Sequence, residues 1–202
     1  MSPSPGFQSF LDGLEGQIAE LPLRNQVAFA ASCCERAIPN YQAFSEAEKW
    51  GDAEFLRNCL DRVWSFIEGE PLSSEEAKTL EAKCKAITPN SDDFSSDYVD
   101  AAQEAAFMVT LLLQWVGDQN PHYAVRIATF CRDTVDLHVQ VLESLNPSDP
   151  DLEDKIARHP LMSAELAKQS QDLGTLAKIK TRDELKKFRA TTRQTGGSNI
   201  GI

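Results

Sequence analysis

The most chemically distinctive stretch of this 202-residue chain is 28–41, which combines small side chains with Glu35 and Arg36. Small residues one and two turns before Glu35 share its face of a predicted helix, so a neighbouring helix can approach closely there. We therefore expect Glu35 to be partly buried. A buried carboxylate must be ion-paired or protonated, and Arg36, Arg57 and Arg62 are the candidate partners. The simpler interpretation is a structural ion pair.

A second interpretation places a polar cleft here. Farther along the chain, Arg57 and Asp61 lie one helical turn apart, with Trp64 at the edge of the same face. If the two stretches meet, their side chains could line one cleft that binds a small ligand or serves an unrecognised enzyme. The six candidate cleft residues are Glu35, Arg36, Asn40, Tyr41, Asp61 and Trp64. For Arg57 and Asp61, the alternative is a solvated surface pair.

The sequence contains few groups that point to catalysis. It has no glycine-rich phosphate loop, no nucleophile elbow and no paired metal-binding histidine motif. Cys131 and His138 are seven positions apart and share a predicted helix face, but no further metal ligands stand at a recognisable spacing. We therefore predict no catalytic residue, no metal and no cofactor, and we favour a non-catalytic protein over an enzyme.

The cysteines and the first residues bear on location. The five cysteines are an odd number without a C-x-x-C pair, and each lies in a predicted helix. They are typical of small, reduced core residues in a cytoplasmic protein. The segment 1–6 has no features of a secretory signal and is expected to be disordered, and the densest apolar stretch, 105–116, is too short to span a membrane.

The charge distribution separates the end of the chain from the rest. The net charge is −11, which argues against general nucleic-acid binding. From position 178 onward seven basic residues face two acidic ones, a local charge of +5, so residues 1–177 carry −16. A basic end and an acidic body invite contact within one chain or between two copies, and we predict a self-associating interaction module. An acidic immunity-type or decoy protein is a weaker alternative.

Apolar residues recur at spacings of three and four along the whole chain, which predicts helices and no significant sheet. We expect an all-α, single-domain bundle over 1–202 with about eight to ten helices. Its central pair should be helices over about 98–116 and 121–145. Pro39 should end a helix that begins near Pro22, and 182–202 should form a basic last helix and tail.

Four motifs, in this order along the chain, resemble the YjaG-like bacterial family, the domain-of-unknown-function 416 family. They are Cys34-Glu35-Arg36 leading to Pro39-Asn40-Tyr41 and Phe44, Leu60-Asp61 with Trp64, Asp92-Asp93-Phe94, and Ser198-Asn199-Ile200-Gly201-Ile202. The resemblance implies an all-helical fold and a bacterial cytosolic protein. It brings no established activity, cofactor or catalytic residue.

Composition and resemblance disagree about residues 198–202. The glycine-rich composition of 196–202 predicts a flexible end. A family motif at this place instead implies a segment that docks on the body. Its candidate docking residues are Ser198, Asn199, Ile200, Gly201 and Ile202. We expect them to pack near Pro39, Asn40 and Tyr41, with Asn199 bonded to exposed backbone.

Overall fold

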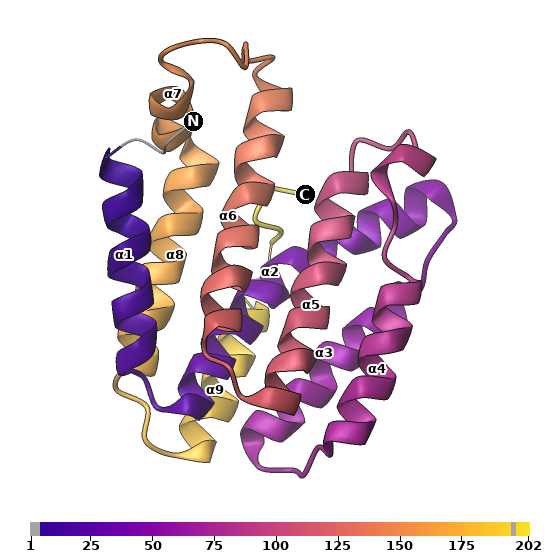
Figure 1. Ribbon diagram of the computed structural model, residues 1–202, viewed down its shortest axis with the longest axis vertical. Helices are drawn as coiled ribbons and strands as arrows, with labels where there is room; N and C mark the ends of the chain where they lie inside the picture. Colours follow the sequence, from indigo (N-terminus) through magenta and orange to yellow (C-terminus); the bar gives the residue numbers. More distant parts are fainter. Residues whose placement is uncertain (1–4, 195–196) are drawn as a thin grey trace.

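A computed structural model describes the backbone of residues 5–194 and 197–202, and the side chains from residue 13 onward within those ranges. The described residues form nine α-helices, one short 3-10 helix and no strand, so the predicted all-α bundle is confirmed (Figure 1). α1 begins at Pro5, inside the segment that we predicted to be disordered, and residues 1–4 lie outside the described residues. No helix within the described ranges is long and apolar enough to cross a membrane.

The helices follow one another with short connections. They are α1 (Pro5–Glu20), α2 (Leu23–Glu48), α3 (Ala53–Glu68), α4 (Ser74–Ala86), η1 (Ser91–Asp93), α5 (Val99–Asp118), α6 (His122–Leu142), α7 (Leu152–Arg158), α8 (Pro160–Leu176) and α9 (Arg182–Gln194).

Local capping explains several helix ends. Ser73 accepts a hydrogen bond from the Glu76 amide at the start of α4, and Thr181 accepts one from the Glu184 amide before α9. α3 ends at Gly69, whose φ of 112° lies in the left-handed region that glycine adopts without strain.

α2 is the central helix, because it contacts α3, α5, α6, α8 and α9. Our prediction that Pro39 ends this helix was wrong: α2 continues through Pro39 to Glu48. Proline in a helix costs about 3 kcal/mol because it removes one hydrogen bond and crowds the preceding turn. Residues on both sides of it, including Ile38, Tyr41 and Phe44, are fully buried, and this packing offsets that cost.

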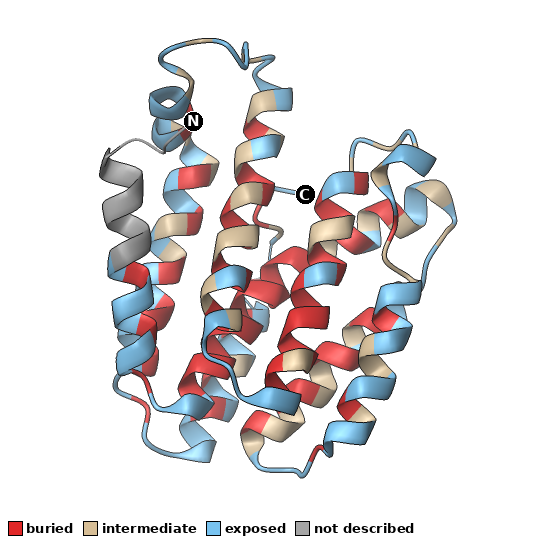
Figure 2. Ribbon diagram, viewed as in Figure 1, coloured by how far each residue is buried: buried red, intermediate tan, exposed pale blue. Residues whose placement is uncertain are grey.

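The centre of the bundle differs from the predicted pair of helices. α5 is buried over most of its length, as expected, but the second half of α6 leaves Leu137, Val141 and Leu142 exposed (Figure 2). α2 takes the central position instead, although its sequence is more polar than that of α6. α6 also ends at Leu142 rather than near 145, and Ser144 follows with a positive φ of 50°.

Candidate functional site

Glu35 is buried at the junction of three helices. It is 5% exposed, and its carboxylate accepts hydrogen bonds from Arg57 (2.6 Å) and Trp64 (2.8 Å) of α3 and from Arg193 of α9 (3.2 Å). The side chain is therefore ion-paired, and its two oxygens are both occupied. Of the partners suggested by the sequence, Arg57 is the one that pairs with Glu35, whereas Arg62 pairs with Glu76.

Asp61 belongs to the same cluster. Arg189 of α9 donates to its carboxylate at 3.1 Å, Arg193 forms a second ion pair with it, and Arg57 lies 3.9 Å away. The guanidinium of Arg189 also lies 5.8 Å from the centre of the Trp64 ring. Arginines of α9 thus fill the space between Glu35 and Asp61.

Arg36 points to another side of α2, toward α8. It forms a bidentate pair with Glu165 of α8, at 2.9 and 2.7 Å, and a bond of 3.1 Å to Asp172. Burial lowers the pKa of Arg36, but neighbouring groups, above all the Glu165 carboxylate, together more than reverse this effect, so the pKa lies well above its usual range. Lys168 supplies a second cation to Asp172.

Asn40 and Tyr41 lie apart from both ion clusters. Asn40 is fully buried and bonds to the segment 198–202. The Tyr41 hydroxyl donates to the carbonyl of Ile87 at 2.6 Å, and burial raises its pKa. Gly51 leaves room for this hydroxyl, since a Cβ there would lie 2.4 Å from it.

The six residues that we assigned to one polar cleft therefore occupy four separate environments. Glu35, Asp61 and Trp64 come together, as the sequence suggested, and α9 covers them. Arg36 lies elsewhere because consecutive helix residues point about 100° apart. The contribution of Arg189 and Arg193 was missed; the +5 charge of 178–202 was the only signal for it.

Residues 198–202 lie between α2 and α6, with the C-terminus between α5 and α6 in the view of Figure 1. The backbone N–H of Asn199 donates to the backbone carbonyl of Arg36 at 3.1 Å. Arg36 lies one helical turn before Asn40 in α2. The Asn199 side chain accepts from Asn40 (2.9 Å) and donates to the Cys131 carbonyl (2.8 Å). Ser198 donates to Asn40 as well.

The apolar residues of this segment divide between core and surface. Ile200 is 3% exposed and joins a small apolar cluster with Val135, Val139 and Met162. Ile202 is 44% exposed. Gly201 has a φ of 83°, which lets the chain turn outward between them.

A groove of about 500 Å³ opens beside this segment, between the first half of α5 and the second half of α6. We call it the α5–α6 groove. Its lining residues are Asp97, Tyr98, Asp100, Ala101, Glu104, Thr134, Leu137, His138, Val141, Leu142, Ile200, Gly201 and Ile202. Four of the six large apolar side chains that are exposed among the described residues line it: Leu137, Val141, Leu142 and Ile202.

The groove also has an unusual acidic side. Burial raises the pKa of Glu104 to about 7. A hydrogen bond from the Thr134 hydroxyl lowers the pKa, and the nearby carboxylates of Asp133 and Asp100 raise it by smaller amounts. His138 is half-buried at the groove, and burial lowers its pKa. The sequence did not reveal the groove, because an exposed apolar stripe has the same periodicity as a buried one.

No group of three or more His, Cys, Asp or Glu side chains arranged to hold a metal ion occurs in the part of the chain that the structure describes. The ion clusters around Glu35 and Arg36 are closed by arginine and lysine side chains. Their chemistry is that of internal charge neutralisation.

Comparison with known proteins gives a family and a fold. The family model described as "Protein of unknown function (DUF416)" matches residues 13–202. No curated protein matches the chain. The crystal structure of a DUF416 family protein from Shewanella baltica is similar over 93% of this chain and 97% of that one, with 26% sequence identity and a TM-score of 0.85. The chain therefore belongs to the DUF416 family, as the motifs indicated.

Proposed function

We propose that the protein is a non-catalytic interaction module that self-associates through the α5–α6 groove. The observation that carries this proposal is the exposed apolar stripe along the groove, where Val141 is 65% and Leu142 is 57% exposed. Exposed apolar side chains that gather at one groove are candidates for an interaction site, whereas scattered single ones are normal on any protein surface. The ion clusters at Glu35 and Arg36 are closed by their partners, which favours this interpretation over a ligand cleft at those residues.

The spacing of the stripe favours a second copy of the chain as the partner. Phe130, Leu137 and Val141 follow one another at intervals of seven and four residues, a spacing found along the seam that two packed helices share. Phe107 of α5 extends the stripe through its contact with Phe130, with ring centres 6.4 Å apart. The same seam on a second copy, related by a two-fold axis, can cover this one.

The acidic residues at the groove predict how the affinity between two copies of the chain depends on salt concentration. The carboxylates of Asp97, Asp100 and Glu104 line the groove and would approach those of the partner copy. Added salt screens this repulsion, so pairing through the groove should strengthen with salt. Pairing of the basic α9 with an acidic body would instead weaken with salt. The direction of the effect separates the two modes.

Sedimentation equilibrium at low and high salt tests the proposal. The native chain should form a dimer whose dissociation constant falls with salt, and the double variant Leu137→Glu/Val141→Glu should be monomeric. Leu23→Glu is the matched control, because Leu23 is 50% exposed but lies on α2, outside the groove. A native monomer at every concentration, or a dimer that survives the double substitution, would show that the groove does not mediate self-association.

We also infer a cytoplasmic location. All five cysteines are free and buried, which is typical of proteins in a reducing compartment. Fractionation of cells expressing the tagged protein tests this, and recovery in a membrane or extracellular fraction would contradict it.

A further inference from the structure

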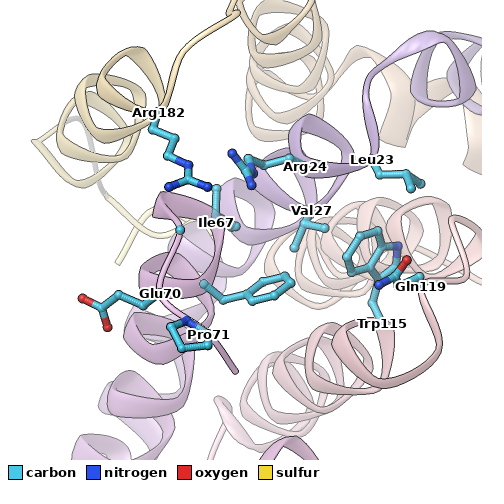
Figure 3. Close-up of a pocket in the computed structure, with 11 residues that line it drawn as sticks. Leu23, Arg24, Val27, Ile67, Glu70, Pro71, Trp115, Gln119 and Arg182 are labelled. Carbon is cyan, nitrogen blue, oxygen red and sulfur yellow. The ribbon is translucent and has the colours of Figure 1, made fainter. Parts of the chain in front are cut away.

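A second pocket, of about 380 Å³, lies at the opposite end of α5 from the α5–α6 groove. The start of α2, the ends of α3 and α5 and the start of α9 form its wall. Figure 3 shows Arg24 and Arg182 on one side of it and Trp115 and Gln119 on the other, with Val27 between them. We call it the arginine pocket. Its volume is within the range of small-molecule sites.

The two arginines of this pocket have no anionic partner among the described residues. Neither Arg24 nor Arg182 forms an ion pair or a side-chain hydrogen bond within the described residues. Seven of the other eight arginines form ion pairs: Arg36, Arg57, Arg62, Arg132, Arg158, Arg189 and Arg193. The chain has 31 acidic and 20 basic residues, yet two guanidinium groups from distant segments line this pocket without an anion from the described part of the chain. Glu70 lines the pocket, but its carboxylate points away from both (Figure 3).

The fold holds Arg182 in this position. Its guanidinium lies against the backbone of Gly69, where a Cβ would be only 2.4 Å from the Nη1 atom. The Asn25 side chain donates to the carbonyls of Leu176 (2.7 Å) and Ile179 (3.1 Å), which joins the loop before α9 to the start of α2. Arg24 and Arg182 therefore come together through packed elements.

Two further donors lie at the same pocket. Trp115 is 3% exposed, and its indole N–H is buried without a hydrogen-bond acceptor in the described structure. A buried donor in this state is costly. The 26-residue helix α2 begins here after Pro22, with no side-chain cap and no acidic residue in its first turn. Such a helix start attracts anions.

We infer that the arginine pocket binds a small organic anion, a carboxylate or a phosphate ester attached to an apolar body. Guanidinium groups match the planar oxygens of both anions, and the uncapped start of α2 adds to the attraction. Val27, Phe66 and Ile67 provide the apolar wall for the rest of the molecule. This site is distinct from the α5–α6 groove and does not depend on self-association.

Isothermal titration with four probes tests the inference. Phenyl phosphate and benzoate carry both parts of the predicted ligand, inorganic phosphate lacks the apolar body, and phenol lacks the charge. We expect saturable binding of phenyl phosphate, benzoate or both, at least tenfold tighter than that of inorganic phosphate, and none of phenol. Preference between the first two distinguishes a phosphate site from a carboxylate site.

Substitutions assign the binding to this pocket. Arg24→Gln and Arg182→Gln should each weaken binding about tenfold to a hundredfold. Arg158→Gln removes the same charge from α7, where the side chain is 82% exposed, and should change the affinity less than twofold. Absence of saturable binding, equal binding of inorganic phosphate, or binding unaffected by the Arg24→Gln/Arg182→Gln double variant would overturn the inference.

Discussion

Substitution of Asn199 should reveal how strongly residues 198–202 hold the bundle together. Asn199→Ala removes the acceptor of the Asn40 amide group, at 2.9 Å, and the donor to the Cys131 carbonyl, at 2.8 Å. Asn40 is fully buried, so its N–H group is left without this partner. An unsatisfied buried group costs about 1 to 3 kcal/mol, so two of them amount to about 2 to 6 kcal/mol.

Thermal unfolding measures this loss. For a domain of this size about 1 kcal/mol corresponds to 2 to 4 °C, so we expect the melting temperature to fall by roughly 4 to 24 °C. Ile202→Ala is the control in the same segment, because Ile202 is 44% exposed and should change the stability by no more than about 0.5 kcal/mol.

A double-mutant cycle separates the contact from other effects of the substitution. If Asn199 and Asn40 stabilise each other, the cost of Asn40→Ala/Asn199→Ala should be smaller than the sum of the single costs by about 0.5 to 3 kcal/mol. A shift below 2 °C for Asn199→Ala, or strict additivity, would refute the reasoning and support a flexible end instead.

Three other predictions concern buried ionisable groups. Glu104→Gln should stabilise the protein at pH 8 by up to about 3 kcal/mol and have little effect at pH 4. The folded pKa of Glu104 is raised to about 7, so the native protein loses stability as the pH rises from the unfolded pKa of this carboxyl to the folded one, and glutamine removes this loss. Urea unfolding at both pH values measures the difference. Arg36→Met should destabilise the fold by about 3 to 5 kcal/mol in urea unfolding, since it leaves the Glu165 carboxylate unpaired, and Glu165→Gln in the same chain should recover part of the loss; a cost below 1 kcal/mol would contradict this. Burial raises the pKa of the Cys34 thiol, and all five cysteines are buried, so a thiol reagent should modify none in the native protein and five after denaturation; rapid native labelling would contradict the packing.

Features that depend on local sequence could be predicted from the sequence. The capping residues Ser73 and Thr181 act on amides three positions later, and both hydrogen bonds are present at 3.1 and 3.3 Å. The helical periodicity likewise gave the all-α fold. The prediction of where α2 ends was wrong because the free-energy cost of Pro39 is local, whereas the packing that offsets it comes from helices distant in the sequence.

The positions of polar side chains were harder to predict. Glu35 was expected to be buried and paired, and it is, but its partner Arg193 is 158 residues away. Arg36 pairs with Glu165 at a separation of 129 residues. Residues at such distances meet only through the tertiary fold, so a single sequence contains no spacing that identifies them. The exposed stripe of α6 was missed for the same reason, since burial depends on what covers a helix.

The two ion clusters on α2 also fix the register of this helix. Glu35 and Arg36 are neighbours of opposite charge, and each meets opposite charges on its own side of the bundle. If α2 slipped by one residue in one direction, Glu35 would face the carboxylates of Glu165 and Asp172. A slip in the other direction would place Arg36 against other arginines. An apolar core tolerates the exchange of similar side chains, but it does not tolerate two buried charges of the same sign in contact. These two adjacent residues therefore disfavour a core in which α2 is shifted by one residue in either direction.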